Sequence, residues 1–177
     1  MAKSLIFLTG YRGSGKTAVA QLLAQRLGWS WSDADVVLEA KLGRTIRQAF
    51  AEQGEEKFRA KESDILAELV KGKNAVIATG GGVVLRPENR ERLRTGFVVW
   101  LTSNAETLWQ RMQQDATTAE RRPPLAQGGL EETRDLLKKR ELLYAQCADL
   151  VVDTTKMTPD AVAEAIANHA QLKRART

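Results

Sequence analysis

Short apolar runs, each bounded by turn residues, recur along the chain and predict buried β-strands. Four runs are clear, and a shorter run with two tryptophans is a candidate fifth. They lie at Leu5–Leu8, Ala75–Ala78, Phe97–Leu101 and Leu150–Val152, with Trp29–Trp31 as the weaker fifth. Because these runs are continuous rather than alternating, both faces of each strand are expected to be covered.

Helical periodicity fills the stretches between the apolar runs, so strands and helices alternate along the chain. Such alternation predicts right-handed β-α-β crossovers and an open parallel sheet with helices on both faces. A length of 177 residues and a hydrophobic content of 43% fit a single domain over residues 1–177. In such sheets, ligands bind beyond the carboxyl ends of the strands, so the residues after each run are the first candidates for function.

The residues after the first apolar run match the phosphate-loop pattern G-x-x-x-x-G-K-[ST]. They read Gly10-Tyr11-Arg12-Gly13-Ser14-Gly15-Lys16-Thr17. A predicted strand precedes them, and an amphipathic helix over Ala18–Leu27 follows, which is the context in which this pattern binds phosphate. The alternative is a glycine-rich turn with an accidental Lys-Thr pair, and the flanking elements favour the phosphate loop.

A phosphate loop predicts a site for a nucleoside triphosphate with Mg²⁺. Its glycines allow the backbone N–H groups of Gly13, Ser14 and Gly15 to turn inward around a phosphate. The following helix adds its positive N-terminal end. Lys16 is expected to reach the β- and γ-phosphates, and the Thr17 hydroxyl to bind the metal ion.

Two acids, Asp33 and Asp35, follow the weak fifth run. Either could simply cap the helix that begins near Val36. Capping explains one acid better than two, and beside a phosphate loop a chemical use is expected. We predict that one carboxylate lies near the hydration shell of Mg²⁺ and that the other accepts a hydrogen bond from the hydroxyl to be phosphorylated.

Two helical patterns follow these acids. Thr45 is placed to cap a short helix through Phe50, and Gly54 begins another helix. Along the second helix, Arg59 is four positions after Glu55 and three before Glu62. From these residues alone, Arg59 is best explained by a surface ladder of ion pairs, which contributes only about a few tenths of a kcal/mol.

Three consecutive glycines, Gly80–Gly82, follow the run at Ala75–Ala78. A flexible turn is the simple explanation, but it does not require three glycines. Glycine at this edge of the sheet allows a ligand to approach bare backbone, so a binding role is favoured.

The chain between the last two strands contains a long irregular stretch. Ser103–Glu106 has the spacing of a capping box and predicts the start of a helix. Residues 113–129 are then polar and aperiodic, and a loop of this length in a compact domain is typical of a mobile lid over an active site. A helix over Thr133–Tyr144, which carries Arg140, is predicted after the lid.

Composition narrows the class of protein. The net charge of +5 comes from cations interleaved with acids, and the basic tail lacks the aromatic residues of a nucleic-acid groove. Cys147 is the only cysteine, which excludes an internal disulfide, and no Cys/His cluster has metal-site spacing. No apolar run approaches the about 20 residues of a membrane span. We therefore expect a soluble, cytoplasmic protein that binds neither nucleic acid nor membrane.

The motifs, taken together and in order, resemble those of the shikimate kinase family from Leu5 to about Ala165. The phosphate loop alone is shared by many enzymes, but the ordered set is specific. The matching stretches are Gly10–Thr17, Asp33-Ala34-Asp35, Gly54-Glu55 with Phe58-Arg59 and Glu62, Gly80-Gly81-Gly82, Arg122-Pro123-Pro124-Leu125, and Arg140 with Tyr144.

This resemblance implies a three-layer α/β/α fold like that of nucleoside monophosphate kinases, with a five-stranded parallel sheet. It also implies ATP-dependent phosphorylation of shikimate at the 3-hydroxyl, which gives shikimate 3-phosphate and ADP on the path to chorismate and the aromatic amino acids. The region that binds shikimate would span residues 33–62, and the lid residues 113–129. A monomer is expected.

The resemblance also assigns roles to individual residues. It implies that Asp35 binds the hydroxyls of shikimate, that Arg59 and Arg140 hold its carboxylate, and that glycines 81 and 82 add backbone contacts. It thereby reverses the interpretation of Arg59 as part of a surface ladder. A planar guanidinium suits a carboxylate, so the assignment agrees with the residue chemistry.

Further implied roles concern ATP and Mg²⁺. Arg122 of the lid would contact the transferred phosphate, and Asp33 would act on Mg²⁺ through water, together with Thr17. The family's lid often reads R-P-L-L where this chain has Arg122-Pro123-Pro124-Leu125. Where relatives often place arginine against the adenine, Lys156 is the only cation, so the ATP contact is assigned to Lys156.

Two alternatives stay open at this point. A kinase for another small polyol acid, such as gluconate, would share the phosphate loop and differ in the acceptor site. A nucleotide-dependent binding module or switch is the alternative from a different class, and it is motivated by the positive net charge.

Overall fold

The protein is built around one sheet of five parallel strands, in the order β2-β3-β1-β4-β5. The structure is a computed structural model that describes residues 4–115 and 129–174. The strands are β1 Leu5–Thr9, β2 Ser30–Asp33, β3 Ala75–Ala78, β4 Phe97–Thr102 and β5 Leu150–Asp153. The predicted parallel sheet is confirmed, and the weak fifth run forms β2 at one edge, paired with β3.

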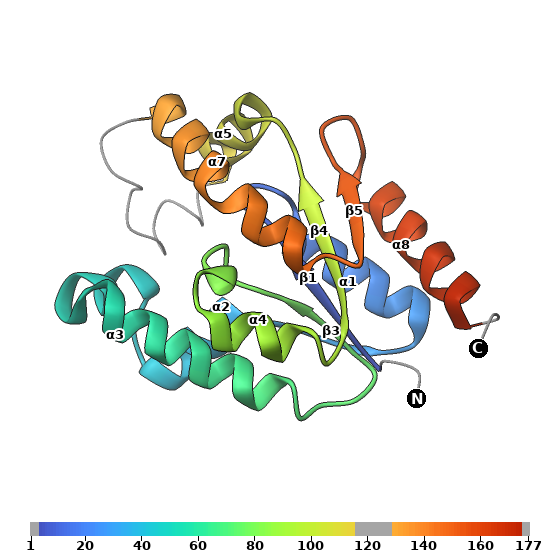
Figure 1. Cartoon of the computed structure of the whole chain (residues 1–177), viewed down its shortest axis with the longest axis horizontal. Helices are drawn as coiled ribbons and strands as arrows, with labels where there is room; N and C mark the ends of the chain where they lie inside the picture. Colours follow the sequence, from blue (N-terminus) through green and yellow to red (C-terminus); the bar gives the residue numbers. More distant parts are fainter. Residues whose placement is uncertain (1–3, 116–128, 175–177) are drawn as a thin grey trace.

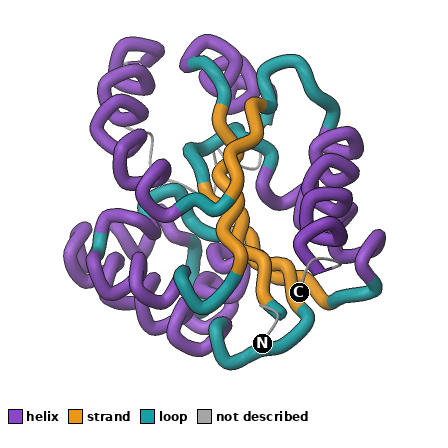
Figure 2. Tube along the Cα trace, turned by 45° about the vertical axis from the view of Figure 1, so that its right-hand side comes forward, coloured by secondary structure: helices purple, strands orange, loops and turns teal. Residues whose placement is uncertain are grey.

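Helices cover both faces of this sheet, which gives three layers (Figures 1 and 2). The helices are α1 Lys16–Leu27, α2 Ala34–Leu42, α3 Ile46–Leu69, α4 Pro87–Leu93, α5 Ala105–Gln114, α7 Gly129–Cys147 and α8 Pro159–Arg174, with a short 3₁₀ helix, η1, at Val83–Leu85. In Figure 1, α1 and α8 lie side by side on one face, while α3, α4 and α7 lie toward the other.

Strand β1 shows why the apolar runs are continuous. Its residues alternate between the two faces, and all of them are buried. Ile6 and Leu8 join the core formed with α1 and α8, whereas Leu5 and Phe7 join the core formed with α3, α4 and α7. A central strand between two helical layers needs an apolar side chain at every position, so no alternation appears in the sequence.

Several helix boundaries follow the predicted caps, and two predictions need correction. Gly28 ends α1 in the left-handed conformation, and Thr45 begins α3 with a complete capping box. Gly54 interrupts α3 at φ 77°, so the two predicted helices form one kinked element. The capping box predicted at Ser103–Glu106 is wrong, because the side chain of Asn104 caps α5 by accepting the N–H of Thr107.

Parallel pairing brings the carboxyl ends of the strands to one edge of the sheet. The phosphate loop follows β1, Asp33 ends β2 with Asp35 in the first turn of α2, and the three glycines follow β3. These segments come from different parts of the chain and meet at this edge, which is where ligands bind in open α/β sheets.

Candidate active site

The phosphate loop has the backbone conformation that its sequence predicted. Gly10, Gly13 and Gly15 have φ values of 135°, 77° and 88°, which other residues rarely adopt. A Cβ atom at Gly10 would overlap the carbonyl oxygen of Leu101, and one at Gly13 would lie 2.8 Å from that of Leu108. Glycine is therefore required both for dihedral angles and for space.

Lys16 is buried at the start of α1 and folds over the loop. Its Nζ donates to the carbonyl oxygens of Gly10 at 2.8 Å and Tyr11 at 2.9 Å. Gly15, which precedes α1, has no side chain with which to cap the first N–H groups of the helix. A helix N-terminus and a fixed ammonium group together favour the binding of a phosphate.

Asp33 uses its two carboxylate oxygens for two purposes. Oδ1 accepts the N–H groups of Asp35 at 2.9 Å and Val36 at 3.3 Å, so Asp33 caps α2. Oδ2 accepts the hydroxyl of Thr17 at 2.5 Å. Capping therefore accounts for one of the two acids, and the same carboxylate also faces the phosphate loop.

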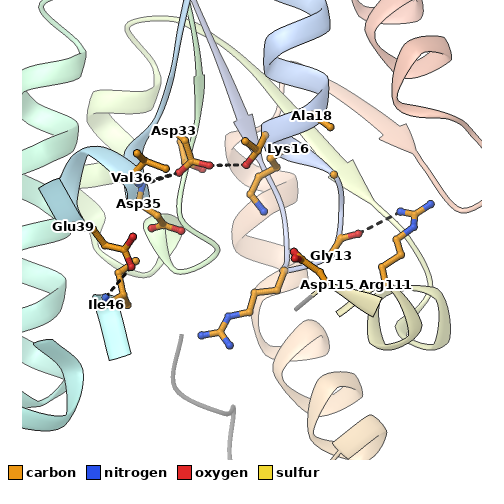
Figure 3. Close-up of a pocket in the computed structure, with 14 residues that line it drawn as sticks. Gly13, Lys16, Ala18, Asp33, Asp35, Val36, Glu39, Ile46, Arg111 and Asp115 are labelled. Carbon is orange, nitrogen blue, oxygen red and sulfur yellow. Dashed lines mark hydrogen bonds between the residues drawn. The ribbon is translucent and has the colours of Figure 1, made fainter. Parts of the chain in front are cut away.

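A cavity of about 420 Å³ lies between the phosphate loop and α2. Its lining includes Lys16, Thr17, Asp33 and Asp35, which the sequence analysis singled out separately. Figure 3 shows the side chains of Lys16, Asp33 and Asp35 around this space. The cavity thus joins a phosphate-binding loop to a buried carboxylate, Asp35, that can accept a proton or a hydrogen bond.

The three glycines after β3 make room for the side chains around them. A Cβ atom at Gly80 would overlap Oε1 of Glu62 and lie 3.0 Å from Oδ1 of Asp35. One at Gly82 would overlap the guanidinium group of Arg59. Because Gly82 has a φ of −97°, its requirement is for space and not for an unusual backbone conformation.

Arg59 is not part of a surface ladder. Its side chain is only 14% exposed, and its NH1 donates to Oε2 of Glu62, which is 5% exposed, at 2.9 Å. Glu55 accepts a longer hydrogen bond of 3.4 Å from Arg59. Burial raises the pKa of Glu62, and the guanidinium of Arg59 opposes this shift. The arrangement fixes the direction of Arg59 in a partly desolvated site.

Arg140 approaches the same glycines from α7. Its NH1 donates to the carbonyl oxygen of Gly81 at 3.4 Å, and the hydroxyl of Tyr144 donates to that same oxygen. Burial raises the pKa of Tyr144 to about 12, so its hydroxyl remains a donor at neutral pH. Arg59 and Arg140 therefore lie against neighbouring glycines, although they are far apart in the chain.

Arg111 is a candidate that the sequence analysis missed. It donates to the carbonyl oxygen of Gly13 at 3.4 Å, as Figure 3 shows, and to that of Thr154 at 2.7 Å. It also lines a second cavity of about 150 Å³ together with Gly15, Met157 and Pro159. The sequence does contain one indication of this role. Arg111 is three positions after buried Leu108, and this spacing places both residues on the face of α5 that meets the phosphate loop.

Two predicted ATP contacts, those of Lys156 and Arg122, are not tested by these cavities. Lys156 is exposed, and the second cavity is lined by its neighbour Met157. Arg122 lies outside the described residues, as does most of the predicted lid, so both roles stay predictions.

Within residues 4–115 and 129–174, no group of three or more His, Cys, Asp or Glu side chains could hold a metal ion. Among the described helices, none combines the length and apolar character needed to cross a membrane.

Comparison with known proteins places the chain in a family. Residues 12–171 match the family described as shikimate kinase. The chain belongs to the shikimate kinase family. Its relatives include the shikimate kinase of Symbiobacterium thermophilum, which is 47% identical over 90% of this chain and 92% of the relative. The shikimate kinase of Synechococcus sp. strain CC9902 is 44% identical over 91% of this chain and 83% of the relative.

Solved structures confirm the fold expected of a shikimate kinase. The shikimate kinase from Acinetobacter baumannii, solved in complex with shikimate, superposes with a TM-score of 0.90 at 36% identity, over 96% of this chain and 94% of that chain. The Bacillus subtilis YorR protein, at 16% identity, has a TM-score of 0.62 over 96% of this chain and 97% of that chain, which shows a shared fold alone. The resemblance found in the sequence is thereby confirmed.

Proposed function

We propose that this shikimate kinase family member transfers the γ-phosphoryl group of ATP to the 3-hydroxyl of shikimate, on the path to chorismate and the aromatic amino acids. The observation that carries the proposal is the meeting of Asp35, Arg59 and Arg140 at the glycines beside the phosphate loop. A substrate with one carboxylate and several hydroxyls is complementary to two guanidinium groups and one carboxylate.

ATP is assigned to the phosphate loop and the cavity beside it. The N–H groups of Gly13, Ser14 and Gly15 surround the phosphates. When ATP binds, Lys16 donates its hydrogen bonds to phosphate oxygens in place of the loop carbonyl oxygens. Arg111 and Pro159 line the second cavity, whose position next to Gly15 suits the adenine and ribose. Lys156 and Arg122 keep their assigned contacts with ATP as part of this proposal.

Mg²⁺ is assigned to Thr17 and Asp33. A hydroxyl and a carboxylate lie 2.5 Å apart at the mouth of the phosphate loop, and hard oxygen ligands of this kind fit Mg²⁺. Two protein oxygens are few, which agrees with an ion that keeps water molecules and shares ATP phosphates as ligands. Bound there, the ion supplies positive charge to the phosphates, with Asp33 acting through water.

Shikimate is assigned to the region of residues 33–62 and the glycines. Arg59 and Arg140 hold its carboxylate, and glycines 81 and 82 present backbone to its ring. Asp35 then accepts the hydrogen bond of the reacting hydroxyl. Residues 113–129 are proposed to close over the bound substrates as a lid.

The reaction follows from this placement. The 3-hydroxyl oxygen forms a bond to the γ-phosphorus, and the bond from that phosphorus to the bridging oxygen of ADP breaks. The hydroxyl proton passes to Asp35, which lies in the cavity beside Lys16. Lys16 stabilises the charge that develops on the transferred group and on ADP.

We also propose that one chain forms the whole site and acts as a cytoplasmic monomer without a nucleic-acid or membrane partner. The described donor and acceptor groups all come from a single chain. Size-exclusion chromatography with light scattering tests this; an active dimer and inactive monomer would contradict it.

A panel of acceptors tests the reaction. Shikimate, gluconate, quinate and nucleoside monophosphates are offered with Mg²⁺ and ATP, and ADP release is followed. Turnover with shikimate alone is expected. Turnover of gluconate without turnover of shikimate would overturn the proposal in favour of another polyol-acid kinase, and ATP hydrolysis stimulated only by nucleic acid would indicate a binding module.

A further inference from the structure

We propose that Tyr11 is a positioning residue for the acceptor: its ring supports Arg140 and so connects the phosphate loop to the carboxylate-binding end of the site. This inference rests on the proposed function, because it concerns how Arg140 is held for shikimate. The phosphate-loop pattern leaves the residue at this position free, so the pattern itself assigns it no role.

The two ends of Tyr11 face the two halves of the site. Its backbone carbonyl accepts Nζ of Lys16 at 2.9 Å, on the side where ATP phosphates are assigned. Its ring lies under the guanidinium of Arg140, with 5.8 Å between the ring centroid and Cζ. Tyr11 therefore contacts both Lys16, the cation assigned to ATP, and Arg140, a cation assigned to shikimate.

Tyr11 is enclosed, although it lies in a loop at the edge of the sheet. It is only 1% exposed, and its side chain lies beside Thr133 and Arg140 of α7. A cation over an aromatic face is attracted more strongly when solvent is excluded. The burial of Tyr11 thus favours a contact that fixes the position of Arg140.

Arg140 depends on this ring more than Arg59 depends on its own. Arg59 also lies over an aromatic ring, that of Phe58 at 5.2 Å, but it has Glu62 as an ion-pair partner at 2.9 Å. Arg140 forms no ion pair with any carboxylate among the described residues, and its hydrogen bond to Gly81 is 3.4 Å long. An unpaired guanidinium is free to bind a carboxylate, and it then needs another group to hold its direction.

The backbone of the phosphate loop reinforces this connection. A Cβ atom at Gly81 would lie 3.5 Å from the carbonyl oxygen of Gly10 and 3.7 Å from the backbone nitrogen of Arg12. The loop residues on both sides of Tyr11 therefore pack against the glycine whose carbonyl Arg140 contacts. Tyr11 cannot move without disturbing the same corner of the acceptor site.

Substitution of the ring tests the proposal. Tyr11→Leu and Tyr11→Met keep an apolar side chain and remove the aromatic face, and Tyr11→Phe keeps the face and removes the hydroxyl. We expect the first two to raise the KM for shikimate about tenfold, with kcat and the KM for ATP within about threefold of the parent protein. Tyr11→Phe is expected to keep the KM for shikimate at the value of the parent protein.

A double-mutant cycle separates action through Arg140 from general damage. Tyr11→Leu combined with Arg140→Lys should raise the KM for shikimate little more than Arg140→Lys alone, because the ring has no guanidinium left to hold. Tyr11→Leu combined with Arg59→Lys should show additive effects. Thermal unfolding identifies variants that have not folded, and Tyr11→Met provides the readout if Tyr11→Leu is one of them.

The outcomes are distinct from those of the function test. If the parent protein phosphorylates shikimate but both ringless variants fold and keep its KM, the role of Tyr11 is refuted while the function stands. The role would also be refuted if Tyr11→Phe raised the KM for shikimate as much as Tyr11→Leu does, because the hydroxyl and not the aromatic face would then be responsible. Additivity with Arg140→Lys would likewise overturn it.

Discussion

The donor and acceptor halves of the site are built in different ways. The phosphate-binding part of the donor half is one continuous segment, Gly10–Thr17, to which Asp33 is added. The acceptor half takes Asp35 from α2, Arg59 from α3 and Arg140 from α7, and joins them at the glycines after β3. A continuous segment carries its geometry in local spacing, whereas the acceptor half exists only once the sheet has formed.

Glycine serves each half for a different reason. In the phosphate loop, Gly15 has a φ of 88° and open space around the position of a Cβ atom, so its role is conformational. Beside the acceptor arginines, Gly82 has an ordinary φ of −97°, and a Cβ atom there would overlap Arg59. In the donor half every loop glycine has a left-handed or similar φ, with close backbone contacts added at Gly10 and Gly13, whereas in the acceptor half the need for side-chain space alone explains Gly82.

The largest effect is expected from a substitution in the donor half, Lys16→Ala. Lys16→Ala removes the fixed cation that stabilises charge on the transferred phosphoryl group, so kcat should fall at least about a hundredfold. Lys71→Ala is the matched control, because Lys71 is exposed and precedes β3, at the amino end of the strands and opposite the site. Coupled measurement of ADP release checks both. A folded Lys16→Ala variant with near-normal turnover would show that the phosphate-loop assignment is wrong.

The next effect separates recognition of the acceptor from use of ATP. Arg59→Lys and Arg140→Lys keep the charge but lose the planar, two-pronged geometry, and we expect each to raise the KM for shikimate about tenfold. The KM for ATP should stay nearly unchanged. Arg94→Lys, an exposed arginine paired with Glu91, is the control. Steady-state kinetics with each substrate varied in turn would contradict the assignment if both variants kept the parent KM for shikimate.

A pair of glycine substitutions sharpens the contrast between conformation and space. Gly82→Ala should displace the Arg59 guanidinium and raise the KM for shikimate about fivefold, the equivalent of about 1 kcal/mol. Gly15→Ala imposes a side chain on a left-handed residue and should raise the KM for ATP instead. Identical kinetic profiles for the two folded variants would remove the distinction between the halves.

The smallest effect concerns the acid that holds Arg59. Burial raises the pKa of Glu62 in the folded state, so the folded protein binds the proton more tightly than the unfolded chain. The resulting stabilisation is fully present below the unfolded pKa of about 4.5 and is lost as pH rises through the raised folded pKa. Glu62→Gln does not titrate, so its unfolding free energy relative to the parent protein should rise across that window.

Urea unfolding of both proteins from about pH 4 to about pH 8 measures this difference. Glu55→Gln is the matched control, because Glu55 is exposed and the two hydrogen bonds that it accepts from Arg59 are both 3.4 Å long. A difference between parent and Glu62→Gln that stayed constant with pH would mean that the Glu62 carboxyl has an ordinary pKa.

The sequence by itself determined most of the elements and the phosphate loop of the donor half. Continuous apolar runs such as Leu5–Leu8 predicted strands buried on both faces, and the spacing of Gly10–Thr17 predicted the loop, because both depend on residues close together in the chain. The weak run at Trp29–Trp31, a candidate fifth strand, corresponds to β2 at Ser30–Asp33, yet the position of β2 as an outer strand of the sheet depends on pairing with β3.

Only the tertiary structure decided how the acceptor half is assembled. From spacing alone, Arg59 was best explained by a surface ladder, because i, i+3 and i+4 pairs are identical in sequence whether they face solvent or a buried glycine loop. The spacing of Arg111 from Leu108 indicated only a shared helix face, and neither its bonds to Gly13 and Thr154 nor the contact of Tyr11 with Arg140 could be deduced from a local pattern. Such contacts join residues that are distant in the chain, so they are determined by how α3, α5 and α7 pack around the carboxyl edge of the sheet.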